Sequence, residues 1–251
     1  MSTIICFALK EEAAPFRKTV AAQAASILLT GIGRRNAEKS LREFLNSCRS
    51  RGDETQIKKE LETPHVVSYE PDLVLTCGFA GGLNPDLKLG DVVIEVPSGS
   101  SRREPAQIES GEKSEPIYIG CYDKLIACGA KPVKFFCADR IATTIAEKKK
   151  LRDETGADAV EMESAAIHAV CAKHGIPCAT VRVISDTAGE DLPLDFNALS
   201  KPDRNLDYGK LFLTIARSPR KVGALMQLQK KTKFAAKQLA AVLSKILQQP
   251  A

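Results

Sequence analysis

The chain has 251 residues, of which 44% are hydrophobic and 27% are charged. This length is sufficient for one sizeable hydrophobic core, and the charged fraction is close to that of an average soluble protein. The formal net charge of +5 is too modest to indicate a nucleic-acid-binding protein, in which basic residues usually cluster on one face.

The eight cysteines predict free, buried thiols. No two of them have the C-x-x-C spacing, and most lie in apolar runs, as Cys77 and Cys171 do. This pattern argues against a disulfide framework or a zinc site and favours a reducing cytosol. No signal peptide and no stretch of about 18 apolar residues is visible, so the sequence predicts a cytoplasmic protein without a membrane span.

Short apolar runs alternate along the chain with longer runs of helical character. The strands that we expect comprise residues 3–8, 26–30, 72–77, 91–96, 133–138, 157–162 and 178–185. The helices that we expect comprise residues 11–20, 34–48, 144–154, 163–174, 206–217 and about 220–248. This alternation is typical of an α/β fold with a mainly parallel sheet covered on both faces. The charged residues 49–64 are expected to extend a helix or form a loop, and the polar residues 98–116 to form an exposed loop.

The last expected helix combines an apolar stripe with a basic surface. Ser218 and Pro219 suit its first turn, and apolar residues recur at helical spacing from Leu225 to Ile246. Its lysines are expected to face solvent on a helix that covers the sheet, and contact with an anionic membrane is the alternative. No linker clearly divides the chain, so we expect one domain over residues 1–251, with the C-terminal helix at 218–251.

Two glycine-rich segments follow expected strands. Residues 30–37, T-G-I-G-R-R-N-A, lead into a helix, but Asn36 stands where the dinucleotide-binding fingerprint requires glycine. This segment is either a plain strand-to-helix turn or a helix N-terminus that accepts an anion. Residues 78–83, G-F-A-G-G-L, follow the strand that ends at Cys77. Glycines there allow the backbone to approach a ligand at the carboxyl end of a parallel strand.

Carboxylates follow three of the expected strands. Glu161 and Glu163 stand two residues apart, so in extended geometry they share a face. They either accept hydrogen bonds from ribose hydroxyls or place negative charge at a helix N-terminus. Asp186 is either a capping residue or a general acid in an enclosed site. Glu12 is either part of an ordinary acidic first helical turn or a general base that activates water.

These segments, in this order, resemble the purine and uridine phosphorylase superfamily, and especially its methylthioadenosine/S-adenosylhomocysteine nucleosidase branch. The resemblance rests on the acidic turn near Glu12, the G-I-G turn, C-G-F-A-G-G-L followed by K-L-G-D-V-V, V-E-M-E-S-A-A and V-R-V-I-S-D. The last two motifs are the most specific, and the similarity extends from residue 3 to about 215. It implies a three-layer αβα nucleoside phosphorylase fold with a mainly parallel, mixed central sheet, and no metal or organic cofactor.

The resemblance assigns acid–base chemistry to two residues. Glu12 would orient and deprotonate the attacking water, and Asp186 would protonate the purine at N7 as it leaves. Cleavage of a ribosyl–base bond passes through an oxocarbenium-like state, and general acid–base help of this kind is worth about 10²- to 10⁴-fold. An anionic Glu163 beside the sugar would favour the positive charge that develops on the ring.

The resemblance also implies which residues surround the substrate. Met162 and Glu163 would hold the ribose, with Glu163 accepting from its 2′ and 3′ hydroxyls. Ile141 would lie beside the base, and Phe196 would lie on its opposite side. The substrate-binding residues expected in this way are Gly78, Phe79, Arg140, Ile141, Glu161, Met162, Glu163 and Phe196.

Water and phosphate are the two nucleophiles that this superfamily uses. Where the resembling phosphorylases carry an arginine before the central glycine turn and a serine or threonine within it, this chain has Thr76 and Phe79. Glu12 and its acidic neighbour replace their glycine-aspartate-proline turn, and a carboxylate there repels a phosphate dianion. We therefore expect hydrolysis, although Phe79 also differs from the nucleosidases. An anion site for phosphate would have to come from Arg34, Arg35 and Arg140.

Two alternatives differ from hydrolysis in reaction and in class. The first is phosphorolysis, which transfers the glycosyl group to phosphate. A subfamily associated with hopanoid lipid synthesis is thought to remove adenine from adenosylhopane in this way. Phe79 and the basic C-terminal helix of this chain would suit such a substrate. The second is a non-catalytic nucleoside-binding protein, against which the joint presence of Glu12, Glu163 and Asp186 argues. The resemblance further implies a homodimer that acts on a small purine nucleoside of the adenine type, with no nucleic-acid partner.

Overall fold

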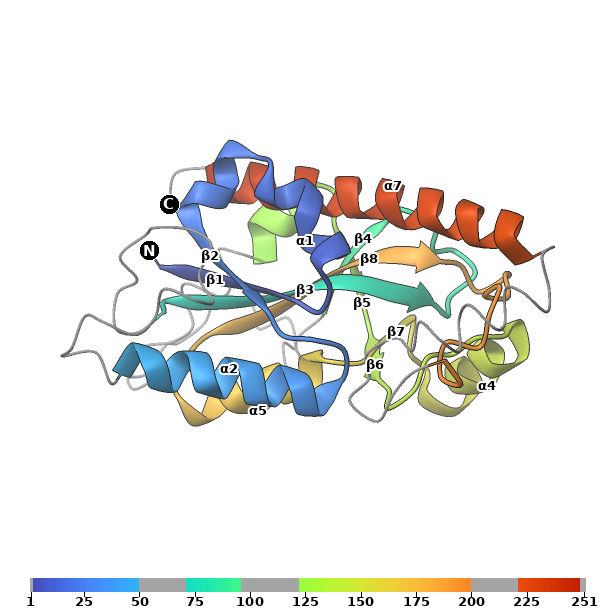
Figure 1. Cartoon of the computed structure of the whole chain (residues 1–251), viewed down its shortest axis with the longest axis horizontal. Coiled ribbons are helices and arrows are strands. Elements are labelled where there is room, and N and C mark those ends of the chain that lie inside the picture. The colour runs from blue at the N-terminus through green and yellow to red at the C-terminus, as the bar shows by residue number, and fades with distance from the viewer. Residues whose placement is uncertain (1, 50–70, 96–121, 200–220, 249–251) are drawn as a thin grey trace, which may run out of the picture.

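A computed structural model describes residues 2–49, 71–95, 122–199 and 221–248, which form a sheet between two helical layers (Figure 1). The strands are β1 (Thr3–Phe7), β2 (Ala25–Leu29), β3 (Leu73–Gly82), β4 (Val92–Glu95), β5 (Lys131–Val133), β6 (Phe135–Cys137), β7 (Ala159–Glu161) and β8 (Cys178–Asp186). The helices are α1 (Lys10–Arg17), the 3₁₀ helix η1 (Val20–Ala24), α2 (Arg34–Arg49), α4 (Ile145–Thr155), α5 (Ser164–Lys173) and α7 (Lys221–Gln248). Residues 122–127 are also helical.

The strands form one eight-stranded mixed sheet in the order β2-β1-β3-β8-β4-β5. Strands β2, β1, β3 and β8 run parallel, whereas β4 is antiparallel to β8. The far end of β3 also pairs antiparallel with β7, and β7 pairs parallel with β6. This arrangement confirms the expected αβα fold with a mainly parallel, mixed sheet.

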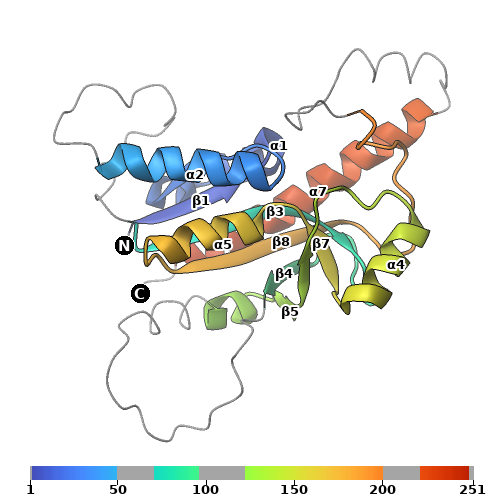
Figure 2. The same cartoon turned by 90° about the horizontal axis from the view of Figure 1, so that it is seen from below.

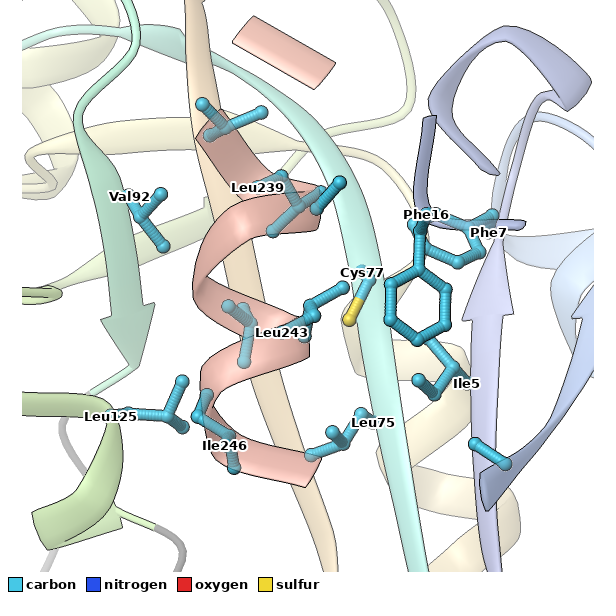
Figure 3. Close-up of a cluster of buried hydrophobic side chains, with 14 of the residues drawn as sticks. Ile5, Phe7, Phe16, Leu75, Cys77, Val92, Leu125, Leu239, Leu243 and Ile246 are labelled. Carbon is cyan, nitrogen blue, oxygen red and sulfur yellow. The ribbon is translucent and has the colours of Figure 1, made fainter. Parts of the chain in front are cut away.

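Helices α1 and α7 cover one face of the sheet, and α2 and α5 cover the other (Figures 1 and 2). On the first face, Leu239, Leu243 and Ile246 of α7 pack on the apolar side chains of the central strands (Figure 3). Phe7 and Phe16 add an aromatic pair with ring centroids 6.3 Å apart. Full burial of one leucine, isoleucine or phenylalanine side chain stabilises the fold by about 1.5–3 kcal/mol, so α7 is an integral part of the core.

The apolar stripe expected on α7 is confirmed for its C-terminal half. In its N-terminal half, the stripe residues Leu225 and Leu228 are half-buried, whereas Val222 and Met226, which do not belong to the expected stripe, are 40% and 57% exposed. The start expected at Ser218 lies outside the described residues, as do the helix expected at 206–217 and the segments at 49–64 and 98–116, apart from residue 49, which ends α2. None of the described helices is long and apolar enough to cross a membrane.

The structure corrects two of the expected strands. The run 133–138 is not one strand: β5 ends at Val133 and pairs with β4, and β6 begins at Phe135 and pairs with β7. Residues 78–82 are not a turn after a strand, because β3 continues through them to Gly82. Pairing with β8 on one side and β7 on the other keeps this glycine-rich segment extended.

Helix boundaries agree more closely with the sequence-based expectations. Helices α2, α4 and α5 lie within a residue or so of the expected ranges. The first expected helix, 11–20, ends early at Arg17, and η1 follows it from Val20. Helices α1, α2 and α5 begin just after β1, β2 and β7, respectively, so their first turns lie at the carboxyl ends of these strands.

Candidate active site

A cavity of about 240 Å³ lies at the carboxyl ends of the central strands. It is lined by Ala8, Leu9, Glu12, Ile32, Phe79, Ala80, Gly81, Arg140, Ile141, Ala142, Val160, Glu161, Met162, Glu163, Ser185, Asp186, Leu192, Phe196, Leu228 and Thr232. All the site residues expected from the sequence line it except Gly78. The structure therefore brings together side chains that come from positions between 12 and 196 of the chain.

Glu12 is a buried carboxylate in the first turn of α1. Its Oε1 accepts a hydrogen bond from the backbone N–H of Phe79 at 2.9 Å, and its Oε2 accepts one from Leu9 at 2.9 Å. Burial raises the pKa of Glu12 and nearby Glu163 raises it further, while Arg182 and the two hydrogen bonds lower it; the net result is a pKa of about 7. A group with this pKa can act as a general base near neutral pH.

Arg182, which sequence analysis did not select, is a buried cation beside the carboxylates of the site. Its Nη2 lies 2.6 Å from Glu161 Oε2 and 3.4 Å from Glu163 Oε2. It also donates to the carbonyl of Cys77 and the hydroxyl of Thr76, each at 3.2 Å. These carboxylates outweigh the effect of burial and raise the pKa of Arg182, so the guanidinium stays charged. An arginine inside the otherwise apolar run V-R-V-I-S-D was the available signal.

Glu161 is used by the protein itself. Its Oε2 accepts from Arg182 and from the backbone N–H groups of Glu163 and Ser164, and its Oε1 accepts from the Ser164 hydroxyl at 2.6 Å. Burial raises the pKa of Glu161, but Arg182 and these hydrogen bonds bring it below its ordinary value. A carboxylate has about four acceptor positions, and these four hydrogen bonds occupy them. Glu161 therefore anchors the first turn of α5 and Arg182, which agrees with the alternative of negative charge at a helix N-terminus.

Glu163 joins the G-I-G turn to the ion-pair cluster. Its Oε1 accepts from the backbone N–H of Gly33 at 2.8 Å, and its Oε2 faces Arg182. Burial raises its pKa, and Glu161 raises it further despite the opposing effects of Arg182 and the Gly33 N–H. The Gly33 N–H, which the sequence suggested as a donor to an external anion, thus donates to the Glu163 carboxylate of the same chain.

Gly78 lies behind the cavity wall, where no side chain fits. A Cβ at this position would be 2.7 Å from both Arg182 Nη1 and Glu12 Oε1, and the residue has φ +150°. The absence of a side chain therefore allows Glu12 and Arg182 to approach each other across β3. This is a different reason for glycine from the backbone approach to a ligand that the sequence predicted.

Asp186 ends β8 and faces the cavity from the other side. Its Oδ1 accepts from the Ser185 hydroxyl at 2.8 Å, and its Oδ2 lies 2.6 Å from Lys148 Nζ. Lys148 is completely buried, and sequence analysis did not select it, because it begins a run of three lysines on α4. Asp186 is therefore half of a buried ion pair.

Two loops meet at the remaining wall of the cavity. The side chain of Asn197 accepts from the backbone N–H of Ile141 and donates to its carbonyl, both at 2.9 Å. This double hydrogen bond fixes Ile141 close to Phe196, the two residues expected to enclose the base. Leu228 and Thr232 extend the same cavity from α7, and no residue of this helix was among the site residues expected from the sequence.

The three arginines proposed for a phosphate site are engaged or placed elsewhere. Arg34 donates to the carbonyl of Cys137 and lies 3.5 Å from Asp139. Arg140 lines the cavity but pairs with Glu147. Arg35 is exposed on α2, in a surface groove outside the cavity. In the part of the chain that the structure describes, no group of His, Cys, Asp and Glu is suited to a metal ion.

Comparisons with known proteins agree with the fold and the motifs. A family model described as "Phosphorylase superfamily" matches residues 128–205. The chain is 30% identical over 150 residues to the 5′-methylthioadenosine/S-adenosylhomocysteine nucleosidase of Shewanella halifaxensis, covering 53% of this chain and 64% of that protein. It is 28% identical over 158 residues to the aminodeoxyfutalosine nucleosidase of Helicobacter pylori, covering 54% and 64%.

The matched segment therefore spans less than two thirds of the length of these curated relatives. The structural similarity is more extensive. The solved structure of the 5′-methylthioadenosine/S-adenosylhomocysteine nucleosidase of Neisseria meningitidis, in complex with methylthio-immucillin-A, superposes with a TM-score of 0.61 at 20% identity, covering 98% of both chains. Together these matches confirm the resemblance to the phosphorylase superfamily and to its nucleosidases.

Proposed function

We propose that this protein hydrolyses the N-glycosidic bond of a purine nucleoside with an adenine-type base. One observation carries the proposal: Glu12, Glu163 and Asp186, which lie at or just beyond the ends of three different strands, line a single cavity. A base for water, an anion beside the sugar and an acid for the leaving group are the three functions that this reaction needs. A binding protein has no need of all three groups.

In the proposed reaction, Glu12 takes a proton from the attacking water. Its carboxylate is held by two backbone N–H groups, which fix its orientation, and its pKa of about 7 allows it to accept a proton near neutral pH. Glu163 accepts from the ribose hydroxyls and stabilises positive charge on the sugar. Asp186 delivers a proton to the purine as the bond breaks.

The charges around the cavity favour water over phosphate as the nucleophile. A phosphate dianion would face Glu12, Glu161 and Glu163, whereas the buried Arg182 is already paired with two of these carboxylates. Arg140, at the rim, is paired as well. Repulsion between like charges is strong in a buried site, because the effective dielectric constant is low.

The relatives support both the reaction and the kind of substrate. Two of them are named as nucleosidases, and one acts, by its name, on 5′-methylthioadenosine. In this chain, Leu9, Leu192 and Leu228 give the cavity an apolar wall. Such a wall suits a nucleoside whose 5′ substituent is apolar.

A base-release assay tests the proposal. Purified protein is incubated with adenosine, inosine and methylthioadenosine, each with and without phosphate, and the free base is quantified. We expect adenine to be released at the same rate in both conditions. Release that requires phosphate would replace hydrolysis by phosphorolysis, and absence of release from every nucleoside would overturn the enzymatic proposal.

A further inference from the structure

Lys148 is a buried cation bonded to the residue proposed as the acid. Its Nζ lies 2.6 Å from Asp186 Oδ2 and donates to the carbonyls of Thr187 and Glu190 at 2.7 and 2.9 Å. The side chain is 0% exposed, whereas the next residue, Lys149, is 73% exposed. Burial of a cation in the first turn of a helix is unfavourable both for solvation and for the helix dipole, so Asp186 must compensate for it.

The hydrogen bonds of Lys148 require its charged form. An ammonium group has three N–H donors and no acceptor, and here it meets three acceptors: two carbonyls and one carboxylate oxygen. A neutral amine would leave one of these acceptors without a donor. The pair therefore stores one proton on Lys148, next to a carboxylate, and only Asp186 of the two lines the cavity.

Other ionisable groups around the pair have partners of their own. The carboxylate of Glu190 bonds to the Thr187 N–H and pairs with Lys231 of α7. Burial raises the pKa of Glu190, but the Lys231 contact, the Thr187 N–H and the charges of Lys231 and Lys148 lower it, so Glu190 is ionised. The cavity that Asp186 lines is also lined by the charged side chains of Glu12, Glu161, Glu163 and Arg140, and Arg140 pairs with Glu147. Arg182 is paired with Glu161 and Glu163.

We infer that Lys148 is a positioning residue that keeps a proton available to Asp186. This inference rests on the proposed function. As the bond between the sugar carbon and the base nitrogen breaks, both bonding electrons go to the base. A proton moves from Lys148 Nζ to Asp186 Oδ2, and from Asp186 to the base, which leaves Lys148 as a neutral amine. The pair recovers its proton from solvent through Asp186 after the base has left.

The pH profile distinguishes this role from a structural one. Without Lys148, Asp186 has no proton source within the protein and must take the proton from solvent, whose supply of protons falls as the pH rises. In Lys148→Met, we expect the alkaline limb of the kcat profile to move to lower pH, with a loss of about tenfold or more near pH 9. A lower rate with an unshifted limb would overturn the inference.

Two further variants complete the experiment. Lys149→Met, the matched control, removes an exposed lysine paired with Asp153 and should leave the profile unchanged. Lys148→Arg keeps the positive charge opposite Asp186, so it serves as the test variant if Lys148→Met does not fold. Because a guanidinium does not release its proton, Lys148→Arg should lose about tenfold or more in kcat at unchanged KM, and a wild-type rate would overturn the inference. If the wild-type protein releases no base, the proposed function fails. If the wild-type protein releases base and the Lys148 variants have the same activity and pH profile, only the role inferred for Lys148 fails.

Discussion

Arg182 and Glu161 form an ion pair of 2.6 Å in which the two side chains are 1% and 0% exposed. A buried pair of this kind is costly to break, because the remaining charge has no solvent to compensate for it. Here the cost is compounded, since Glu163 lies 3.4 Å from the same guanidinium group and also depends on it. Arg182 thus holds the carboxylates of the cavity together.

The first prediction concerns the stability that Arg182 provides. Arg182→Met leaves buried carboxylates without their cation and should lower the free energy of unfolding by about 3–5 kcal/mol, measured by urea denaturation. Arg42→Met is the control, since Arg42 forms a half-exposed i,i+4 pair with Glu38 on α2. That pair should contribute no more than about 0.5 kcal/mol. Equal stability of the two variants would contradict the importance given to Arg182.

The second prediction concerns the pH dependence of activity through Glu12. A carboxylate acts as a base only when it is ionised, and with a pKa of about 7 the ionised fraction of Glu12 rises with pH through neutrality. Below about pH 7, kcat/KM should therefore fall about tenfold for each pH unit. Glu12→Gln should lose about 10²- to 10⁴-fold in rate and show no such limb.

Glu11→Gln is the control for this prediction. Glu11 precedes Glu12 on the same helix but is exposed and does not line the cavity. Its pH profile should follow that of the wild type. If Glu12→Gln kept the acidic limb, another group would have to be the base.

The third prediction tests the close approach of Glu12 and Arg182 behind Gly78. In Gly78→Ala, the new methyl group would lie 2.7 Å from an atom of each side chain, so both must shift. We expect a loss of about 1–3 kcal/mol in stability, and about 10²-fold in kcat/KM because the base is misplaced. Gly189→Ala, at a site with no heavy atom within 4 Å of the added Cβ, should be nearly neutral in both assays.

The sequence was most informative where periodicity and motif order coincide. Strand positions and the edge of the sheet that carries the cavity follow from the alternation of apolar runs. It was less informative about pairing, because a run such as 133–138 does not reveal that its halves join different strands. In the same way, residues 78–82 have turn composition, but two neighbouring strands hold them extended.

The charged groups behind the cavity show a different limit. Lys148, Lys149 and Lys150 are alike in sequence, but only the first is buried, where it contacts Asp186 and the carbonyls of the loop that follows β8. Arg182 could have been recognised as a charge inside an apolar strand, which requires a buried partner. The roles of the site residues and the homodimer expected from the resemblance stay predictions.

The last prediction separates acid catalysis by Asp186 from its pairing with Lys148. Asp186→Asn keeps the size of the side chain but cannot deliver a proton, so adenosine cleavage should slow by about 10²- to 10⁴-fold. A 4-nitrophenyl riboside has a leaving group that needs no protonation, and its cleavage should slow far less.

Asp191→Asn is the matched control for this comparison. Asp191 lies in the loop that follows β8 and is exposed. Within the described part of the chain, its side chain accepts one hydrogen bond, from the Ile145 N–H, which an asparagine oxygen can also accept. It should alter neither substrate's rate. Since Asp186→Asn also removes the charge opposite Lys148, its unfolding must be measured in parallel. An equal loss with both substrates in a folded variant would mean that Asp186 supports the site through its ion pair and not as the acid.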